Sequence, residues 1–284
     1  MDKHKLVEQS IIKKFRPKIW RMFVRAIDEY KLIQENDKIA VCISGGKDSM
    51  LLAKCMEELH KHSDFKFEVV YLCMNPGYTD KNFEKLKSNA KLLNLDIHYF
   101  DTNIFDIVHK IDDSPCYLCA RMRRGHLYNE ARKLGCNKIA LGHHFDDVIE
   151  TVLMSVLYGA EFKTMMPKLI SSNYPGMELI RPLYLVKEQS IVDWAKYNEL
   201  EFLQCACRFT EENHNLKESS SKRKEIKELI NTLRKNYSDI DINIFRSFHN
   251  VNLNTIIGYY DDNKEYNFLD DYDEKLNNSK NKKF

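Results

Sequence analysis

This chain of 284 residues lacks the sequence features of a membrane protein, a secreted protein or a repeat protein. No apolar stretch approaches the ~20 residues that a membrane-spanning helix needs, and the start of the chain lacks the apolar segment of a signal peptide. There is no internal repeat and no excess of one charge, because the net charge is only +2. We therefore expect a cytoplasmic protein without a membrane partner, in which any nucleic-acid surface is a local patch.

Disulfides are also not expected, although the chain has eight cysteines. A reducing compartment argues against a disulfide framework and favours metal or redox use of some of these thiols. Hydrophobic residues make up 43% and charged residues 30% of the chain, which is an ordinary globular composition. This length and composition predict either one large domain or a domain with appendages.

The pattern along the chain divides it into four segments. Residues 1–30 form a basic amphipathic helix, and residues 31–210 form the catalytic domain. A helical segment, 211–250, contains a second basic stretch, 217–235. Both basic stretches fit either an RNA-binding patch or an ordinary solvated helix face. The tail, 251–284, is acidic and rich in Asn and Lys, with little apolar periodicity, so we expect it to be disordered.

Strands and helices alternate through the catalytic domain. This alternation predicts an α/β, Rossmann-like parallel sheet covered by helices on both faces. Ligands of such sheets bind beyond the carboxyl ends of the strands. The predicted strands are 38–43, 67–74, 96–101 and 138–141, and the predicted helices are 49–60, 81–93, 120–133 and 146–157.

The most informative motif is Ser44-Gly45-Gly46-Lys47-Asp48-Ser49, between a predicted strand and a predicted helix. Adjacent glycines allow positive φ and close approach of a ligand, and a helix start offers N–H groups to phosphate. Lys47 adds a positive charge, the two serine hydroxyls can donate, and Asp48 can hold magnesium. The spacing is not the Walker pattern, so transfer of a γ-phosphate is not predicted. The motif instead indicates an ATP pyrophosphatase loop.

A second turn, Gly142-His143-His144-Phe145-Asp146-Asp147, follows another predicted strand. Because Asn75–Gly77 follows a third strand, we expect these turns and the glycine loop to meet at one crevice. His143 and Asp147 are candidates for ordering magnesium or a substrate base. The alternative is that Asp146 or Asp147 only caps the following helix.

Two cysteine pairs are candidates for chemistry. Cys116 and Cys119 form a C-x-x-C at a helix start, and Cys205 and Cys207 form a C-x-C far downstream. The first pair alone fits a redox dithiol, half a zinc site or a cluster site, and three thiolates also fit an iron–sulfur cluster. Arg121, Arg123 and Arg124 follow the first pair, with 121 and 124 on one helix face; they fit either a tRNA clamp or a solvated face. The other cysteines are expected to be core thiols: Cys42, Cys55, Cys73 and Cys136.

Together these motifs resemble the tRNA 2-thiocytidine synthetases, which are PP-loop ATP pyrophosphatases with a three-cysteine Fe-S site. The matching segments, in the family's order, are SGGKDS (44–49), SPCYLCARMRRG (114–125), LGHHFDDVIET (141–151), MMPKL (165–169), IRPL (180–183) and the Cys205/Cys207 pair. The resemblance spans about residues 38 to 208.

The resemblance implies an enzyme that uses ATP and Mg²⁺ to replace the 2-oxygen of an anticodon-loop cytidine of tRNA with sulfur. It implies a 4Fe-4S cluster held by Cys116, Cys119 and Cys207, with Cys205 as the alternate third ligand because the family has C-x-x-C where this chain has C-x-C. It further implies ATP binding by residues 44–49, Gly142 and His143, with Lys47, Asp48 and Asp147 as catalytic residues. The expected partners are tRNA and a sulfur donor, either a cysteine desulfurase or free sulfide, and a homodimer is compatible with the family.

Other interpretations remain open at this point. Lysidine synthetases and amide-forming ligases share the loop but do not need the cysteines. A persulfide-type or uridine-directed sulfurtransferase would use Cys116 as a nucleophile without iron. A nucleotide-binding module with structural zinc would bind ATP without releasing pyrophosphate.

Overall fold

The computed structural model describes residues 2–105, 115–203, 217–261 and 264–281. Its centre is a six-stranded sheet with the strand order β3-β2-β1-β4-β6-β5. Neighbouring strands are parallel except for β5, which runs antiparallel to β6. The strands are β1 (Lys38–Ile43), β2 (Glu68–Asn75), β3 (Ile97–Asp101), β4 (Lys138–Ala140), β5 (Lys168–Ile170) and β6 (Glu178–Ile180).

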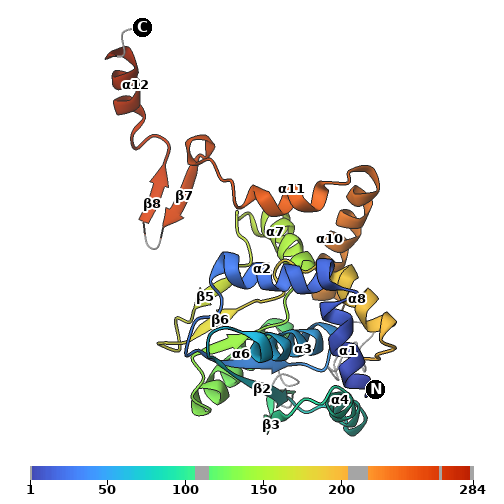
Figure 1. The fold of residues 1–284 in the computed structure, drawn as a ribbon. Coiled ribbons are helices and arrows are strands. Elements are labelled where there is room, and N and C mark those ends of the chain that lie inside the picture. The colour runs from blue at the N-terminus through green and yellow to red at the C-terminus, as the bar shows by residue number, and fades with distance from the viewer. Residues whose placement is uncertain (1, 106–114, 204–216, 262–263, 282–284) are drawn as a thin grey trace.

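Helices surround the sheet, and further helices lie beyond it toward the carboxyl terminus (Figure 1). Those of the sheet region are α1 (Lys3–Ile12), α2 (Arg21–Tyr30), α3 (Lys47–His62), α4 (Asp80–Leu92), α6 (Pro115–Lys133), α7 (Phe145–Gly159) and α8 (Glu188–Tyr197). Helices α10 (Lys217–Asn236) and α11 (Ile240–Ser247) follow, and both contact α7.

The alternation of side chains along β1 explains the layers. Ile39, Val41 and Ile43 face a large core that includes residues of α1, α2, α3, α4, α7 and α8. Ala40 and Cys42 face the opposite side, where they join Tyr128 and Ala131 of α6. Since nearly every residue of β1 is buried, the strand is apolar on both faces, as a central parallel strand must be.

The four predicted strands and the four predicted helices of the sheet are confirmed, with ends within a few residues except where α6 begins five residues earlier. The sequence analysis does not predict β5 and β6, because three-residue strands carry too little periodicity to recognise. Helix α8 is likewise not predicted.

At the amino terminus, the structure differs from the single helix that the sequence predicts. A π-helical turn, Arg16–Trp20, separates α1 from α2. Pro17 lies in this turn and has no N–H to donate, and the N–H of Phe15 donates to Ser10 five residues back (2.8 Å), so the regular helical ladder is interrupted. Val7, Ile11 and Phe23 of this region are nevertheless buried in the main core.

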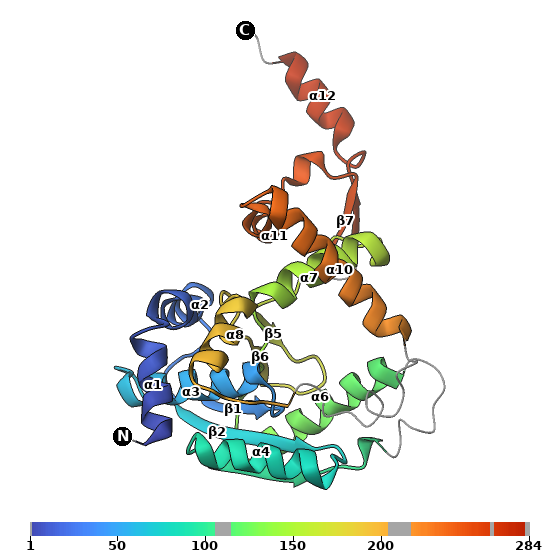
Figure 2. The same ribbon diagram turned by 90° about the vertical axis from the view of Figure 1, so that its right-hand side faces the viewer.

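The acidic tail also differs from expectation, because local structure forms in it. Strands β7 (Gly258–Asp261) and β8 (Lys264–Asn267) pair as a hairpin, and helix α12 (Tyr272–Asn281) follows. Tyr259 and Tyr266 stack across the hairpin with ring centroids 4.7 Å apart, a cross-strand contact that apolar periodicity does not report. The hairpin and α12 extend away from the sheet region (Figure 2).

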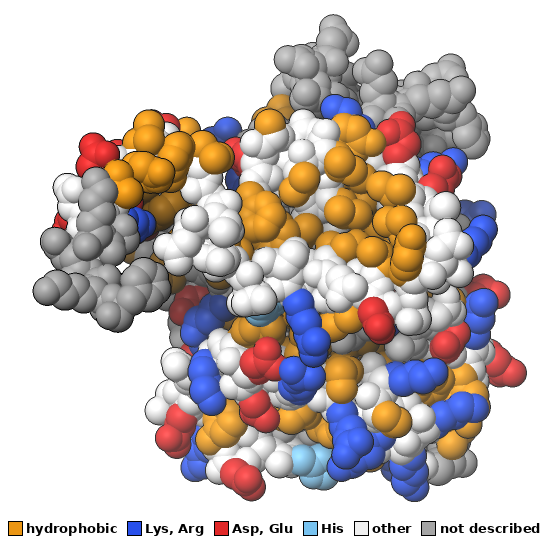
Figure 3. All heavy atoms as spheres, turned by 90° about the horizontal axis from the view of Figure 1, so that it is seen from above, with side chains coloured by type: hydrophobic (Ala, Val, Ile, Leu, Met, Phe, Trp, Pro, Cys, Tyr) orange, Lys and Arg blue, Asp and Glu red, His pale blue; other side chains and the backbone are white. Residues whose placement is uncertain are grey.

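No helix in the four described ranges combines the length and apolar character that crossing a bilayer requires. In the view from above, exposed apolar side chains form a broad group on one half of the surface, and Lys and Arg side chains gather on the other half (Figure 3).

A buried lysine anchors the far end of the sheet. The Lys138 ammonium group lies 2.7 Å from Asp37 and 3.1 Å from Glu178, and it donates to the carbonyl oxygen of Leu32 (3.1 Å). Its side chain is 2% exposed, so losing the ammonium leaves a buried carboxylate without its partner.

We predict that Lys138→Met lowers the free energy of unfolding by about 3 kcal/mol, because breaking a buried ion pair strands a charge. Urea unfolding measures this change. The control is Lys38→Met, since Lys38 pairs with an exposed Glu68 and should change stability by less than about 1 kcal/mol. Equal effects of the two variants would contradict the prediction.

Candidate active site

The glycine motif forms a tight loop between β1 and α3. Gly45 adopts φ +84°, and Gly46 is the N-cap of α3. The backbone N–H and the hydroxyl of Ser44 both lie 3.1 Å from the Ser49 hydroxyl oxygen, which also donates to Gly46 (3.0 Å). A Cβ at Gly45 would lie 2.8 Å from Leu203. The two glycines therefore allow the tight backbone conformation of the loop, and the hydrogen bonds between Ser44 and Ser49 stabilise it.

The second turn approaches this loop closely. A Cβ built on Gly142 would lie 3.1 Å from the carbonyl carbon of Asp48 and 3.1 Å from the backbone nitrogen of Ser49. Only a residue without a side chain allows the two backbones to come this near without displacement. Gly142 thus sets the distance between the start of α3 and the end of β4.

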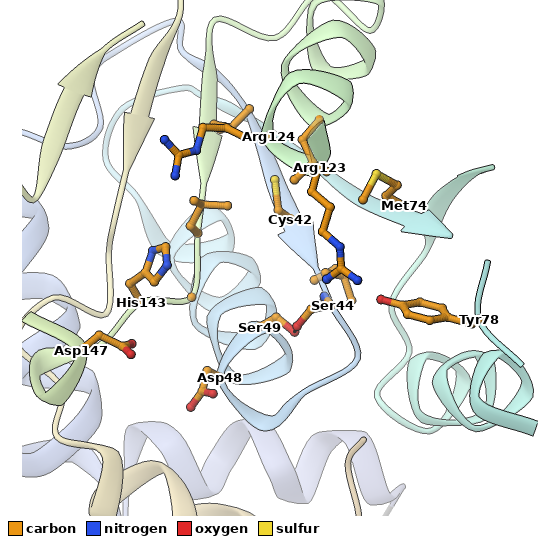
Figure 4. A pocket seen from close by; sticks show the side chains of 15 residues that line it. Cys42, Ser44, Asp48, Ser49, Met74, Tyr78, Arg123, Arg124, His143 and Asp147 are labelled. Carbon is orange, nitrogen blue, oxygen red and sulfur yellow. Dashed lines mark hydrogen bonds between the residues drawn. The ribbon is translucent and has the colours of Figure 1, made fainter. Parts of the chain in front are cut away.

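These turns surround a pocket of about 440 Å³ at the carboxyl ends of the strands. The glycine loop and the second turn line it, together with Met74 and Tyr78, which flank the third predicted turn, Asn75–Gly77. Figure 4 shows its polarity: Asp48, Asp147 and His143 lie at one end, and Met74 and Tyr78 at the other. The sequence-predicted residues that line it are Ser44, Asp48, Ser49, Gly142, His143 and Asp147.

Asp147 caps helix α7 and also lines the pocket. The His144 backbone N–H donates to Asp147 Oδ2 (3.0 Å), and the Asp147 N–H donates to His144 Nδ1 (3.4 Å). This reciprocal pair is the capping box of α7. The capping alternative is therefore correct for one oxygen of Asp147, while Asp147 Oδ1 faces Arg223 at 3.8 Å.

Asp146 serves the framework rather than the pocket. Its Oδ2 accepts from the Glu188 backbone N–H (2.7 Å), and its Oδ1 contacts Arg234 Nη2 (2.6 Å). The side chain is almost fully buried. One carboxylate thereby joins α7 to the first residue of α8 and to the last turns of α10.

Lys47 lies between two carboxylates. Its ammonium nitrogen is 3.0 Å from Asp48 Oδ1 and 3.3 Å from Glu188 Oε1. Burial works against the charged form, but Asp48 and Glu188 outweigh it and raise the pKa of Lys47. Lys47 is thus a fixed positive charge at the start of α3.

One oxygen of Asp48 is a candidate metal ligand. Asp48 Oδ1 is buried and accepts no hydrogen bond from the described part of the chain; Lys47 contacts it only as an ion pair, and His144 Nε2 is 3.8 Å away. The Lys47 ammonium group already neutralises this oxygen in part, and a carboxylate that faces the pocket can also coordinate a divalent cation. The donor set suits Mg²⁺, which prefers carboxylate oxygens.

His143 is held as a neutral ring. Arg181 Nε donates to His143 Nδ1 at 3.3 Å, and the Arg181 guanidinium also donates to the carbonyl oxygen of Met166. Burial, together with the positive charge of Arg181, lowers the pKa of His143 to about 4. Burial and the nearby Arg124 lower the pKa of Arg181 itself to about 10. His143 therefore stays neutral near neutral pH and does not take up a proton there.

A second pocket, of about 480 Å³, adjoins the first and shares Asp48 and Asp147 with it. Lys227 Nζ lies 2.5 Å from Glu188 Oε2, and Arg223 Nε lies 3.1 Å from Glu150. Burial opposes ionisation of Glu188, yet the hydrogen bond from Lys227 and the charge of Lys47 prevail and lower its pKa to about 2. Lysines and arginine of the second basic stretch, Arg223, Lys224 and Lys227, thus reach the glycine loop. The number of basic residues in this stretch predicts a charged patch, but the sequence alone does not predict that the patch lies beside the glycine loop.

The cysteine predictions divide into two groups. Cys42, Cys55, Cys73 and Cys136 are buried, as expected for core thiols. Burial raises the pKa of the Cys42 thiol, which lines the first pocket, to about 12, so it is not a nucleophile. Cys119 lies on α6 and packs against Met74 and Ile104. The side chain of Cys116 and the residues Cys205 and Cys207 lie outside the described residues.

Two of the arginines after Cys119 reach the pocket. Arg123 and Arg124 line it, and the expectation that Arg121 and Arg124 share one helix face stays a prediction. Arg123 Nε is buried and has no hydrogen-bond partner among the described residues, and its guanidinium carbon lies 5.3 Å from the Phe105 ring centroid. The contact with the Phe105 ring distinguishes Arg123 from the other arginines of α6. Helical spacing alone does not reveal such a contact.

Comparison with known proteins identifies the family of this chain. The PP-loop domain family matches residues 17–212. The tRNA-cytidine(32) 2-sulfurtransferase of Geotalea uraniireducens is 32% identical over 250 residues, which cover 87% of this chain and 94% of that protein. The tRNA-cytidine(32) 2-sulfurtransferase 1 of Francisella philomiragia is 34% identical over 248 residues, which cover 84% of this chain and 92% of that protein.

A solved structure shares the fold. The U34-tRNA thiolase NcsA from Methanococcus maripaludis, with its 4Fe-4S cluster, superposes with a TM-score of 0.62 at 20% identity. The superposition covers 81% of this chain and 76% of that one. This likeness supports the predicted α/β architecture.

We predict that Gly142→Ala weakens nucleotide binding about tenfold, because its Cβ must displace the start of α3 by a few tenths of an ångström. Calorimetric titration with ATP measures the affinity. The control is Gly159→Ala at the end of α7, where the nearest atom to an added Cβ is 3.9 Å away. Unchanged affinity in Gly142→Ala would show that the close approach is not needed.

The lowered pKa of His143 predicts a pH-dependent stability. Below its ordinary pKa of about 6.5 the unfolded chain takes up a proton that the folded chain refuses, so stability falls until the pH reaches about 4. His143→Gln removes this loss, which is about 3 kcal/mol at most, and its amide oxygen can still accept from Arg181. Melting temperatures measured between about pH 7 and about pH 5 should decline less in His143→Gln than in the wild type or in the surface control His98→Gln.

Proposed function

Because the chain belongs to the tRNA-cytidine(32) 2-sulfurtransferase family of PP-loop proteins, we propose that it is an ATP-dependent enzyme that thiolates tRNA. The substrate position is the C2 oxygen of an anticodon-loop cytidine. The observation that carries the proposal is the close approach of Gly142 to the Asp48–Ser49 backbone, beside a pocket lined by the Asp48 carboxylate, which pairs with Lys47 at the start of α3. This combination suits a nucleotide whose phosphates meet a helix start and a metal ion.

The polarity of the first pocket orients ATP in this proposal. The adenine lies at the end formed by Met74 and Tyr78, where apolar and aromatic surface is available (Figure 4). The phosphates lie at the Ser44–Ser49 loop, where the N–H groups at the start of α3 and the Lys47 ammonium group offset their charge. Asp48 Oδ1 holds Mg²⁺, with Asp147 beside it.

The first chemical step activates the base. The cytidine O2 attacks the α-phosphorus of ATP, the bond between the α-phosphorus and the bridging oxygen breaks, and pyrophosphate leaves. Charge builds on the phosphates during this step, and fixed donors of the loop together with Lys47 stabilise it without reorganising. His143, neutral near pH 7, accepts from Arg181 through Nδ1, so its Nε2–H can donate a hydrogen bond without adding charge at the pocket.

Sulfur enters in the second step. A sulfide equivalent attacks C2 of the adenylated base, and AMP departs with the former O2. A 4Fe-4S cluster held by Cys116, Cys119 and Cys207 would supply that sulfur as a bound nucleophile, with Cys205 as the alternate ligand. The sulfur comes from a donor such as a cysteine desulfurase or free sulfide.

Chain connectivity supports a position for the cysteines near the loop. The Leu203 backbone N–H donates to the Gly45 carbonyl oxygen (3.2 Å), and Cys205 follows two residues later. Cys119 packs against Met74, which lines the pocket. The contacts of Leu203 and Cys119 therefore support the proposed position of the cluster near the loop.

The remaining parts of the proposal concern partners. Arg123 and Arg124 at the pocket suit the phosphate backbone of tRNA. The basic amino-terminal helices offer a further RNA patch. A homodimer and a cytoplasmic location complete the proposal.

The proposal predicts that cells lacking this protein lose 2-thiocytidine from tRNA and no other thiolated nucleoside. Mass spectrometry of tRNA nucleosides tests this. The wild-type gene should restore the nucleoside, whereas Lys47→Ala and Asp48→Asn should leave less than about a hundredth of it, since they remove charge stabilisation of the phosphates. An unchanged nucleoside profile in the deletion strain would reject the function, and loss of a thiouridine would redirect it to uridine.

Cysteine variants in the same strain separate the cluster from its rivals. Cys116→Ser, Cys119→Ser and Cys207→Ser should abolish 2-thiocytidine, and Cys205→Ser should retain it. Anaerobically purified protein should be brown and release acid-labile sulfide. Colourless, active protein would favour the persulfide mechanism, and bound zinc without pyrophosphate release would favour the nucleotide-binding module.

A further inference from the structure

His143 presents one hydrogen-bond donor to the first pocket. Arg181 Nε donates to its Nδ1 (3.3 Å), and a guanidinium has no lone pair with which to accept in return. Nδ1 is therefore the acceptor, so Nε2 carries the hydrogen of the neutral ring. No residue of the described chain accepts from Nε2, and the ring lines the pocket near Asp147 (Figure 4). This donor is thus available to a ligand.

The sheet determines the position of Arg181. β6 ends at Ile180, and the Leu141 backbone N–H donates to the Ile180 carbonyl oxygen (3.0 Å), so the residues that follow β4 and β6 lie next to each other. Arg181 is 6% exposed, and its guanidinium also donates to the Met166 carbonyl oxygen. No carboxylate among the described residues forms an ion pair with it. Its side-chain contacts therefore fix the ring of His143 rather than neutralise an acid.

The proposed position of ATP leaves this donor for the target base. The adenine lies at the end of the pocket formed by Met74 and Tyr78, and the phosphates lie at the 44–49 loop. His143 lies at the end opposite the adenine (Figure 4). Enzymes that act on a nucleobase bind its Watson–Crick edge through hydrogen bonds. On that edge of a pyrimidine, the atom next to the reacting C2–O2 group is N3.

Cytosine and uracil differ at N3. Cytosine N3 has a lone pair and accepts, whereas uracil N3 carries a hydrogen and donates. When cytosine O2 bonds to the α-phosphorus and pyrophosphate leaves, no proton has to leave N3. The same step with uracil releases the N3 proton to a base. Neither ring nitrogen of His143 has an unused lone pair for that proton, because Nδ1 accepts from Arg181 and Nε2 carries a hydrogen.

We propose that His143 Nε2–H donates to N3 of the target base and thereby selects cytidine over uridine, with Arg181 as the positioning residue that holds the ring in this tautomer. This inference rests on the proposed function, because it explains which base the same site accepts. N3 of cytosine remains an acceptor before and after sulfur replaces O2. The donor therefore keeps its partner through both chemical steps without moving.

Two tRNA substrates that differ only by C or U at the target position test the selection. The reconstituted holoenzyme should have a kcat/KM at least about a hundredfold higher for the cytidine substrate, because a site built for one hydrogen bond rejects a base that cannot make it. His143→Leu removes the donor and should reduce this ratio to less than about tenfold. His143→Gln should retain most of the ratio, since its amide both accepts from Arg181 and donates.

The control is His98→Leu on β3, where the ring is 42% exposed and pairs with Glu130; it should leave the ratio unchanged. Both substrates are assayed with one preparation of each variant, so a loss of folded protein cancels from the ratio. An unchanged ratio in His143→Leu, or equal rates with both substrates in the wild type, would overturn the proposal.

Binding without turnover decides the matter if a variant is inactive. Fluorescence anisotropy measures the affinity for an RNA hairpin of the anticodon stem and loop, with C or U at the target position, in magnesium buffer with a non-hydrolysable ATP analogue. The wild type should bind the C hairpin at least about tenfold more tightly, and His143→Leu should bind both about equally. Weaker binding of the ATP analogue with an unchanged preference for C would show that Nε2 serves the phosphates and would contradict the proposal.

Arg181→Met tests the positioning role. Nitrogen NMR of isotope-labelled histidine should show His143 with its hydrogen on Nε2 in the wild type, and a mixture of both tautomers in Arg181→Met, together with a lower preference for C. Arg181→Lys should restore part of both, since an ammonium group also donates to Nδ1. The control is Arg132→Met on α6, where the guanidinium contacts the Tyr174 ring (6.0 Å). A single tautomer and an unchanged preference in Arg181→Met would reject this role.

Failure of the inference is distinguishable from failure of the proposed function. If 2-thiocytidine disappears from cells that lack the protein, but the preference for C does not depend on His143, only the inference is rejected. If the deletion leaves 2-thiocytidine unchanged, the function is rejected whatever the hairpins show.

Discussion

The arrangement around the glycine loop depends on one buried carboxylate, Asp146. Its oxygens bind the first N–H of α8 and the guanidinium of Arg234 on α10. This link joins the start of α8, where Glu188 contacts Lys47, to α10, where Lys227 contacts the same carboxylate. A charged group this deeply buried persists only when both oxygens are satisfied. The framework of the site is thus fixed by a residue that lines neither pocket among the described residues.

The sequence predicts the parts of the site that depend on local pattern. β1, the glycine turn and α3 carry apolar runs, adjacent glycines and a helix start in order, so residues 44–49 are recognisable without coordinates. The parts of the site that the sequence does not predict depend on contacts between residues that are far apart in the chain. Arg223 and Lys227 look like a solvated basic face until α10 is placed against α7, and Arg123 gains its position from Phe105. Short strands such as β5 are not predicted, because three residues are too few to show an alternation of apolar and polar side chains.

Asp147 shows why a motif residue resists a single assignment. One oxygen completes the capping box of α7, and the other faces Arg223 across the second pocket. The two readings of this residue were alternatives in sequence, because capping and ligand binding both favour an aspartate at a helix start. In the fold they are compatible, since a carboxylate has two oxygens and each has its own direction.

The sharing of Asp48 and Asp147 by both pockets has a thermodynamic consequence. In the proposed function, a divalent cation bound by these carboxylates would change the electrostatic potential in both pockets at once. By linkage, an anion in the second pocket would change the affinity for that cation by the same factor. A substitution of Asp48 or Asp147 would therefore alter the ligand affinity of both pockets together.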